Sequence, residues 1–89
     1  MTEATEKTPI EQITDLAQYL VAGLVPEDAD VKINARERRG EVTVQINADS
    51  AYRGAIIGKS GVIVRALRQV LSAGRFGDGI SRIDVDIAD

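Results

Sequence analysis

The sequence predicts a single two-layer α+β domain, in which three helices cover one face of a three-stranded mixed sheet. Apolar residues recur at helical spacing over residues 10–24, and they alternate with polar residues over residues 31–48. A third observation is that two helical stretches, separated by glycines, precede a last alternating segment. We therefore expect the order helix, strand, strand, helix, helix, strand within residues 8–89.

Residues 1–7 are polar, acidic and without period, and we expect a flexible tail. The first helix should begin at Thr8, which can act as N-cap, with Pro9 at the first helical position and Glu11 completing a capping box. Pro26 should end it, because proline cannot continue the hydrogen-bond ladder. The predicted buried stripe consists of Ile10, Ile13, Ala17, Leu20, Val21 and Leu24.

An antiparallel hairpin with one apolar face follows. Its turn is expected around residues 37–40. The inward-facing residues are Val31, Ile33 and Ala35 on the first strand and Val42, Val44, Ile46 and Ala48 on the second.

Asp49 and Ser50 can cap a short second helix over residues 51–57. A third helix is predicted over residues 61–73, closed by Gly74. Its expected apolar face consists of Val62, Ile63, Ala66, Leu67, Val70 and Leu71. The last strand, with inward-facing Ile83, Val85 and Ile87, can return parallel to the strand before the helices.

The composition excludes several classes of protein. The 89-residue chain is 44% apolar and 28% charged, as is usual for a globular domain. It has no Cys and no His, which removes disulfides, thiolate sites, the commonest general base and the commonest transition-metal ligand. No apolar run is long enough to span a bilayer, and the acidic N-terminus is unlike a signal peptide. We expect a cytoplasmic protein without cofactor, metal or catalytic site.

The charges are segregated along the chain, although the net charge is −3. Residues 1–30 carry seven acids and one base, Lys7. In contrast, residues 51–77 contain no acid and five bases, which are Arg53, Lys59, Arg65, Arg68 and Arg75. A local basic stretch of this kind is typical of nucleic-acid binding, although solvated helix faces would also carry such charges.

The loop Gly58-Lys59-Ser60-Gly61 is the strongest functional candidate. Its glycines let a ligand approach the backbone, and it exposes the first amides of the third helix, whose dipole attracts phosphate. Three other interpretations are open: a nucleotide-binding P-loop, a tight turn with a purely structural role, and a DNA-reading helix-turn-helix. The P-loop is disfavoured because Arg53 stands where its first glycine is required. The DNA-reading motif is disfavoured because the third helix has no cluster of Asn, Gln and Arg at its start.

The stretch Ile56-Ile57-Gly58-Lys59-Ser60-Gly61, followed by Val62-Ile63-Val64, resembles the I-G-x-x-G-x-x-I core of KH domains. The element order is similar to the type II arrangement of that fold. The short length and the segment Arg65-Ala66-Leu67-Arg68 make the chain most similar to the KhpA family of small bacterial RNA-binding proteins. The resemblance covers residues 10 to 88.

The resemblance implies non-catalytic binding of about four unpaired RNA nucleotides, with the loop clamping the sugar-phosphate backbone. It further implies a role as an RNA chaperone or post-transcriptional regulator. We expect bases in a groove between the loop and the second strand, where Val44 and Ile46 could lie. The predicted RNA-binding residues are Gly58, Lys59, Ser60, Gly61, Arg53, Ile56, Ile57, Val64 and Arg65.

Ala55 and Val62 depart from the family, which often carries basic residues at these positions. Weak to moderate affinity is therefore expected for one domain. The resemblance implies self-association and pairing with a larger KH-containing partner, KhpB (Jag). An alternative hypothesis, based on Val62 and Val64, is a protein-interaction module whose loop and third helix form a homodimer or heterodimer interface.

Overall fold

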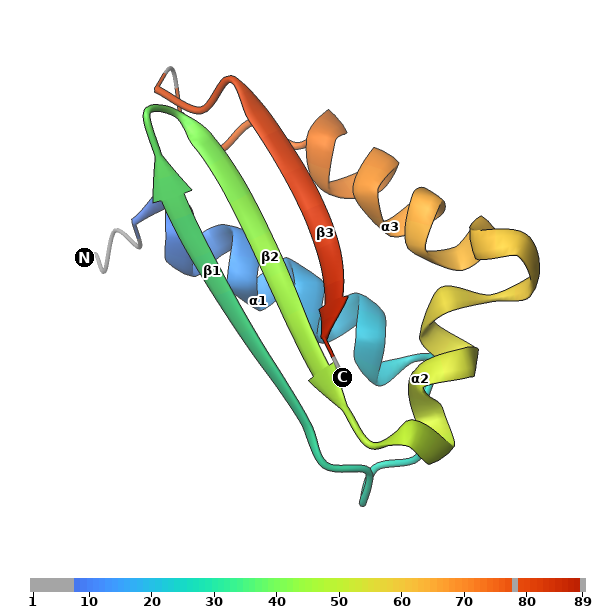
Figure 1. The fold of residues 1–89 in the computed structure, drawn as a ribbon. Coiled ribbons are helices and arrows are strands. Elements are labelled where there is room, and N and C mark those ends of the chain that lie inside the picture. The colour runs from blue at the N-terminus through green and yellow to red at the C-terminus, as the bar shows by residue number, and fades with distance from the viewer. Residues whose placement is uncertain (1–7, 78, 89) are drawn as a thin grey trace.

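The computed structural model describes residues 8–77 and 79–88, so the predicted acidic tail over residues 1–7 lies outside the described residues. The predicted order is confirmed, with three α-helices and three strands arranged α-β-β-α-α-β. All three helices lie on one face of the sheet, as Figure 1 shows. The fold is therefore the two-layer α+β domain of the type II arrangement.

Helix α1, Pro9–Ala22, begins with the predicted capping box. The Glu11 amide donates to Thr8 Oγ1 at 3.2 Å, and the Thr8 amide donates to Glu11 Oε1 at 2.9 Å. The helix ends at Gly23, three residues before Pro26. Its side chains buried against the sheet are Ile13, Ala17 and Val21.

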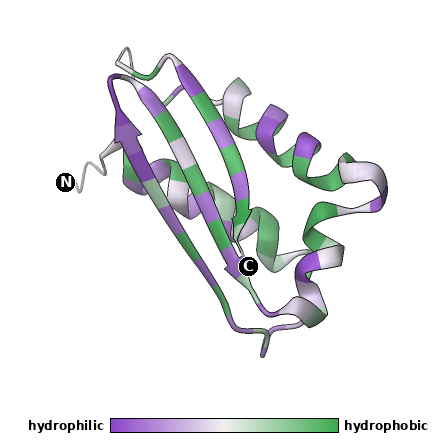
Figure 2. Cartoon of the chain, viewed as in Figure 1, coloured by the Kyte–Doolittle hydropathy of each residue, from purple (hydrophilic) through white to green (hydrophobic). Residues whose placement is uncertain are grey.

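The sheet contains β1 (Val31–Arg38), β2 (Glu41–Ala48) and β3 (Arg82–Ala88) in the order β1-β2-β3. Strand β2 pairs antiparallel with β1 and parallel with β3, so the sheet is mixed as predicted. Figure 2 shows the alternation of apolar and polar residues along β2 and β3. The central strand therefore buries one apolar face under the helices and exposes one polar face.

The hairpin turn is shorter than the sequence suggested. It consists of Arg39 and Gly40 alone, both with positive φ (55° and 83°), because β1 continues to Arg38. Two left-handed residues form the turn that matches the twist of paired strands. The Gly40 carbonyl accepts from the Ser81 amide at 2.8 Å, so the turn is attached to the start of β3.

Helix α2, Ser50–Ile57, is capped by Asp49, whose side chain accepts from the Ala51 amide. A 3₁₀ turn, Lys59–Gly61, separates it from α3, Val62–Ala73. Asp49 at the start of α2 and Gly74 at the end of α3 are the predicted caps, and the bounds of both helices agree with the prediction to within one residue.

The buried face of α3 is narrower than predicted. Leu67 and Leu71 are buried, whereas Ala66 is exposed and Val62 and Val70 are 50% and 46% exposed. The helix packs mainly on the edge strand β3, so the far side of its apolar face remains uncovered. The remaining core consists of Ile13, Ala17, Val21, Val42, Val44, Ile46, Ile56, Ile83 and Val85.

Candidate nucleic-acid interface

The loop between α2 and α3 has a backbone conformation that requires glycine at its two ends. Gly58 has φ 78° and ψ 169°, and Gly61 has φ 77°. A Cβ on Gly58 would lie 2.9 Å from the Ile63 amide nitrogen and would clash with the Ile63 side chain. Ser60, at φ 57°, is left-handed as well. The loop therefore folds tightly back on the start of α3.

The middle of the loop offers hydrogen-bond donors to solvent. Lys59 and Ser60 are exposed, and the first amide bonded within the 3₁₀ turn is that of Gly61, which donates to the Gly58 carbonyl at 3.1 Å. The amides of Lys59 and Ser60 therefore lie outside the turn's own hydrogen bonds. Together with the helix dipole of α3, they can bind an anionic oxygen.

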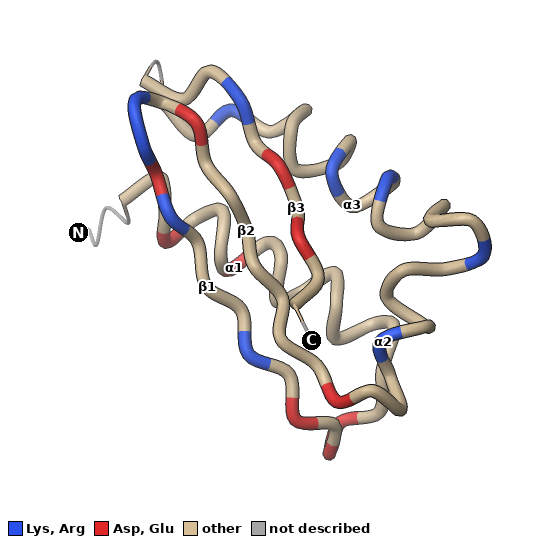
Figure 3. The backbone as a smooth tube through the Cα atoms, in the orientation of Figure 1, with Lys and Arg blue, Asp and Glu red and all other residues tan. Residues whose placement is uncertain are grey.

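Arg65 adds a positive charge that is held in place beside the loop. Its Nη1 donates to the Ser60 carbonyl oxygen at 2.8 Å, which brings the guanidinium of α3 back to the turn before it. Lys59 contributes a second charge from the loop itself. Arg53 is half-buried on α2, a helical turn before Ile57. Figure 3 shows basic residues without acidic neighbours along α2, the loop and α3, whereas the sheet carries residues of both signs.

Val44 and Ile46 of the second strand cannot border a base-binding groove, and the prediction that they face the core is confirmed. Strand β2 is central in the sheet, and its Val44 and Ile46 are 0% and 1% exposed. A strand covered by helices on one face and paired on both sides offers no apolar surface to a base. The edge strand β3 is the one that α3 contacts.

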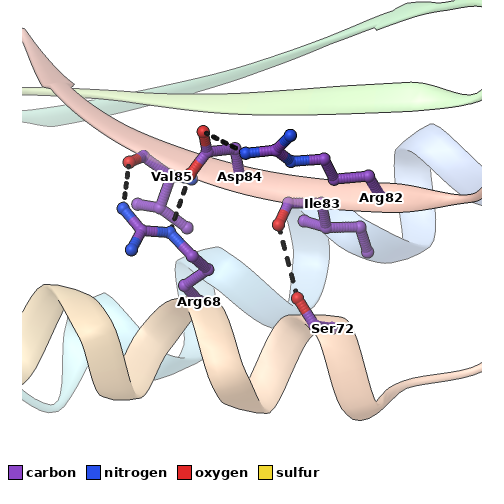
Figure 4. A network of polar contacts seen from close by, with 6 residues as sticks. All are labelled: Arg68, Ser72, Arg82, Ile83, Asp84 and Val85. Carbon is purple, nitrogen blue, oxygen red and sulfur yellow. Dashed lines mark hydrogen bonds and ion pairs between the residues drawn. The ribbon is translucent and has the colours of Figure 1, made fainter.

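Polar contacts fix the spacing between α3 and β3, as Figure 4 shows. Ser72 Oγ donates to the Ile83 carbonyl at 3.3 Å, and Arg68 Nη2 donates to the Val85 carbonyl at 3.4 Å. Arg68 Nε also lies 2.7 Å from Asp84 Oδ1. These contacts occupy the first half of the outer edge of β3.

The contacts between α3 and β3 do not extend to the loop. Figure 1 shows that the two elements diverge, so that the start of α3 lies away from the end of β3. Val64, in the first turn of α3, and Ile87, near the end of β3, are both half-buried and pack against the hydrophobic core.

The predicted binding residues divide into three groups. Gly58, Lys59, Ser60, Gly61 and Arg65 come together at the loop. Arg53, Ile57 and Val64 are half-buried on the helices that flank it. Ile56, by contrast, is 0% exposed, so its predicted contact with a base is corrected to a role in the core beneath α2.

The ion pair between Arg68 and Asp84 was not predicted from the sequence. Its signal was present but indirect: a last strand that follows two helices can pair at the sheet edge, where its polar residues meet those of the helix.

Among residues 8–77 and 79–88, no three acidic residues are grouped so that they could hold a metal ion. No helix in this part of the chain has the length and apolar character needed to cross a membrane.

Comparison with known proteins gives one family. The family model described as the KhpA/KhpB KH domain matches residues 14–87. The RNA-binding protein KhpA of Oceanobacillus iheyensis is 35% identical over 72 residues, covering 81% of this chain and 95% of that protein. The KhpA protein of Streptomyces coelicolor is 36% identical over 77 residues, with coverage of 83% and 95%. That of Mycobacterium tuberculosis is 36% identical over 73 residues, with coverage of 82% and 89%. No solved structure matches the chain significantly.

Proposed function

The chain belongs to the KhpA/KhpB family of KH domains, and from this premise we propose that it binds single-stranded RNA without catalysis, through the loop Gly58–Gly61. The observation that carries the proposal is the loop itself. Two exposed amides and the Lys59 ammonium group lie together there, and Arg65 is tethered to the Ser60 carbonyl. The relatives are RNA-binding proteins by name, which supports RNA as the ligand.

The loop would hold the sugar-phosphate chain and would not read the sequence. Backbone amides and cationic side chains position phosphates, whereas base edges carry the sequence information. A phosphate oxygen at the Lys59 and Ser60 amides would accept hydrogen bonds at the positive end of the α3 dipole. Gly58 and Gly61 keep this backbone free of side chains that would exclude the strand.

Bases would lie beside the loop, against the half-buried side chains of Ile57 and Val64. The carbonyls of Ile83 and Val85 already accept from α3, so this part of β3 is not open to base edges. Apolar side chains give shape-limited contact with about four nucleotides. The chain has only three aromatic residues, so stacking should contribute little and sequence preference should be mild.

The affinity of one domain should be weak to moderate. Ala55 and Val62 are exposed beside the loop, where the family often has basic residues. Each missing phosphate contact on a single strand reduces the log-log salt slope by about 0.7. A second RNA-binding chain, such as a larger KH-containing partner, would raise the effective concentration. A role in the cytoplasm as an RNA chaperone or post-transcriptional regulator would follow from such binding.

The test is a titration of single-stranded RNA against the wild type and the double variant Lys59→Asp, Ser60→Asp. The variant should lose most of the affinity, because two new carboxylates would repel the phosphates. A control with the same change in charge is Arg39→Asp, Gln18→Asp, placed on the exposed hairpin turn and on α1. Equal binding by the wild type and the loop variant would rule out the loop as the clamp.

A second candidate function is a protein-interaction module. The exposed apolar residues Val62, Ala66 and Val70 follow one another at four-residue spacing along α3, which favours a helix-packing interface. Light scattering of the wild type against Val62→Arg tests it. A dimer mass that falls to the monomer mass in the variant supports this interface, and a monomer mass in both removes it. Dimerisation and RNA binding are compatible.

A further inference from the structure

A cavity of about 640 Å³ lies at the end of α3 opposite to the loop. It is formed where α3 ends and the chain turns back into β3. The walls come from the last turn of α3, the connecting segment and the first residues of β3: Ser72, Gly74, Arg75, Phe76, Gly77, Ile80, Ser81, Arg82 and Ile83. Its size is within the range of small-molecule sites, about 300–1,000 Å³.

The chemistry of the cavity is cationic at the rim and aromatic inside. Arg75 and Arg82 are exposed, and among the described residues none that lines the cavity is acidic. Asp84, which follows closely on β3, lies 3.9 Å from Arg82 Nη2 through its Oδ2, and its side chain is 43% exposed. Phe76 is half-buried because its ring packs against the hydrophobic core and on Gly74, where a Cβ would lie 2.5 Å from Phe76 Cε2. The half of the ring that stays accessible lines the cavity. Two guanidinium groups and one partly exposed aromatic ring suit a phosphate joined to a flat base.

The cavity and the loop are joined by one face of α3. Arg65, Arg68 and Ser72 follow at spacings of three and four residues, and Arg75 comes three residues later. The first of these bonds the loop, and the next two bond β3. The helix of 12 residues separates the two sites by about 18 Å. Arg68 and Ser72 are engaged with β3, so a single strand extending from the loop would be held at the two ends of α3, by the loop and by the cavity.

We infer that the cavity is a second contact for single-stranded RNA, taking one nucleotide of a strand that the loop also holds. Arg75 and Arg82 would pair with its phosphate, and Phe76 would stack on its base. The inference rests on the proposed function, since it extends the footprint of the same RNA. It adds a length requirement: strands that reach both ends of α3 bind more tightly than strands that cover the loop alone.

The experiment compares two oligoribonucleotides, one of about four nucleotides and one roughly four times as long. Each is titrated at several salt concentrations against the wild type, Arg75→Glu with Arg82→Glu, and Phe76→Leu. For the long strand, the arginine variant should reduce the salt slope by about 1.4, since two phosphate contacts are lost. Phe76→Leu should weaken binding of the long strand about fivefold or more. Binding of the short strand should not change with either variant.

A matched control is Lys32→Glu with Arg36→Glu, which changes the net charge equally from exposed positions on β1. If the cavity variant and this control reduce long-strand binding equally, the effect is net charge alone and the inference is overturned. An unchanged salt slope in the cavity variant also overturns it. If the double variant does not fold, the single variant Arg75→Glu, in the connecting segment, replaces it in the experiment. This variant should reduce the log-log salt slope of long-strand binding by about 0.7.

Two further outcomes are informative. One distinguishes a free nucleotide from a nucleotide of an RNA strand, and the other distinguishes failure of the loop as a clamp from failure of the second contact. In an NMR titration, a free ribonucleoside monophosphate could shift the amide signals of residues 72–83. If it does so while substitution of Arg75 and Arg82 leaves long-strand binding unchanged, the cavity binds a small ligand and the inference is overturned. If the loop variant keeps its RNA affinity while the cavity variant loses it, the proposed clamp fails and the second contact stands.

Discussion

Two turns of this protein use left-handed backbone conformations, and they differ in what satisfies them. The hairpin turn has Arg39 at φ 55° and Gly40 at φ 83°, and the loop has Ser60 at φ 57° and Gly61 at φ 77°. At the hairpin, groups of the chain itself satisfy the backbone hydrogen bonds of Gly40. The Gly40 carbonyl accepts from the Ser81 amide, and the Gly40 amide donates to Glu37 Oε2. Gly40 is buried, whereas the centre of the loop is exposed.

The two turns differ in whether the chain uses their donors. Both have similar φ values, and both carry a basic residue. Of the two, the loop is the one that stands at the start of α3 with amides outside its own hydrogen bonds. On the proposed function, these surroundings and not the turn conformation distinguish the loop from the structural turn at the hairpin.

The largest effect on stability is expected from Gly40→Ala. A Cβ there would lie 2.6 Å from the Gly79 carbonyl oxygen, at a φ that side chains disfavour. Overpacking and backbone strain together should lower the free energy of unfolding by about 3 kcal/mol. Urea denaturation measures it. RNA affinity of the folded fraction should remain at the wild-type value, and a loss of affinity there would contradict the structural role of this turn.

A smaller but sharper contrast is expected inside the loop. Gly58→Ala brings a Cβ against Ile63 backbone and side-chain atoms and should cost about 2 kcal/mol. Gly61→Ala meets only the flexible end of Arg65, at 3.3 Å, and should cost about 1 kcal/mol. Thermal or urea unfolding of both variants shows which substitution lowers the free energy of unfolding more. Equal costs would mean that the contact of Gly58 with the start of α3 does not hold the loop in place.

The smallest effects on stability are expected at Arg39 and Ser60, the two non-glycine residues of these turns with left-handed backbone conformation. Arg39→Gly and Ser60→Gly each relieve strain but add freedom to the unfolded chain, so each should stabilise by only about 0.5 kcal/mol. The two values should agree, because the φ angles of Arg39 and Ser60 agree (55° and 57°). Denaturant midpoints test this, and a gain at one turn with a loss at the other would show that the backbones differ in strain.

Local signals in the sequence predicted the elements well. The Thr8 capping box, the Asp49 cap and the period of two in the strands depend on neighbouring residues only, and each was confirmed. The loop position was predicted for the same reason. Features that depend on packing were missed. The sequence could not distinguish the buried Leu67 from the exposed Val62 and Val70, because all three lie on the apolar part of α3.

The groove shows the same limit. Periodicity assigns residues to strands, but the position of each strand in the sheet is set by tertiary pairing. The structure places β2 in the centre of the sheet and β3 at its edge, so Val44 and Ile46 are core residues and cannot contact a base. The cavity at Arg75 and Arg82 was likewise invisible, because a turn of the chain creates it.

The measurement that tests the central claim most directly is the salt dependence of short-strand RNA binding by Lys59→Asp and Arg39→Asp. The two changes alter net charge equally, one in the loop and one in the hairpin turn. Lys59→Asp should reduce affinity strongly and lower the log-log salt slope by about 0.7 or more, whereas Arg39→Asp should leave both near wild type. Equal losses at the two turns would contradict the account, because binding would then follow net charge and not the unused donors of the loop.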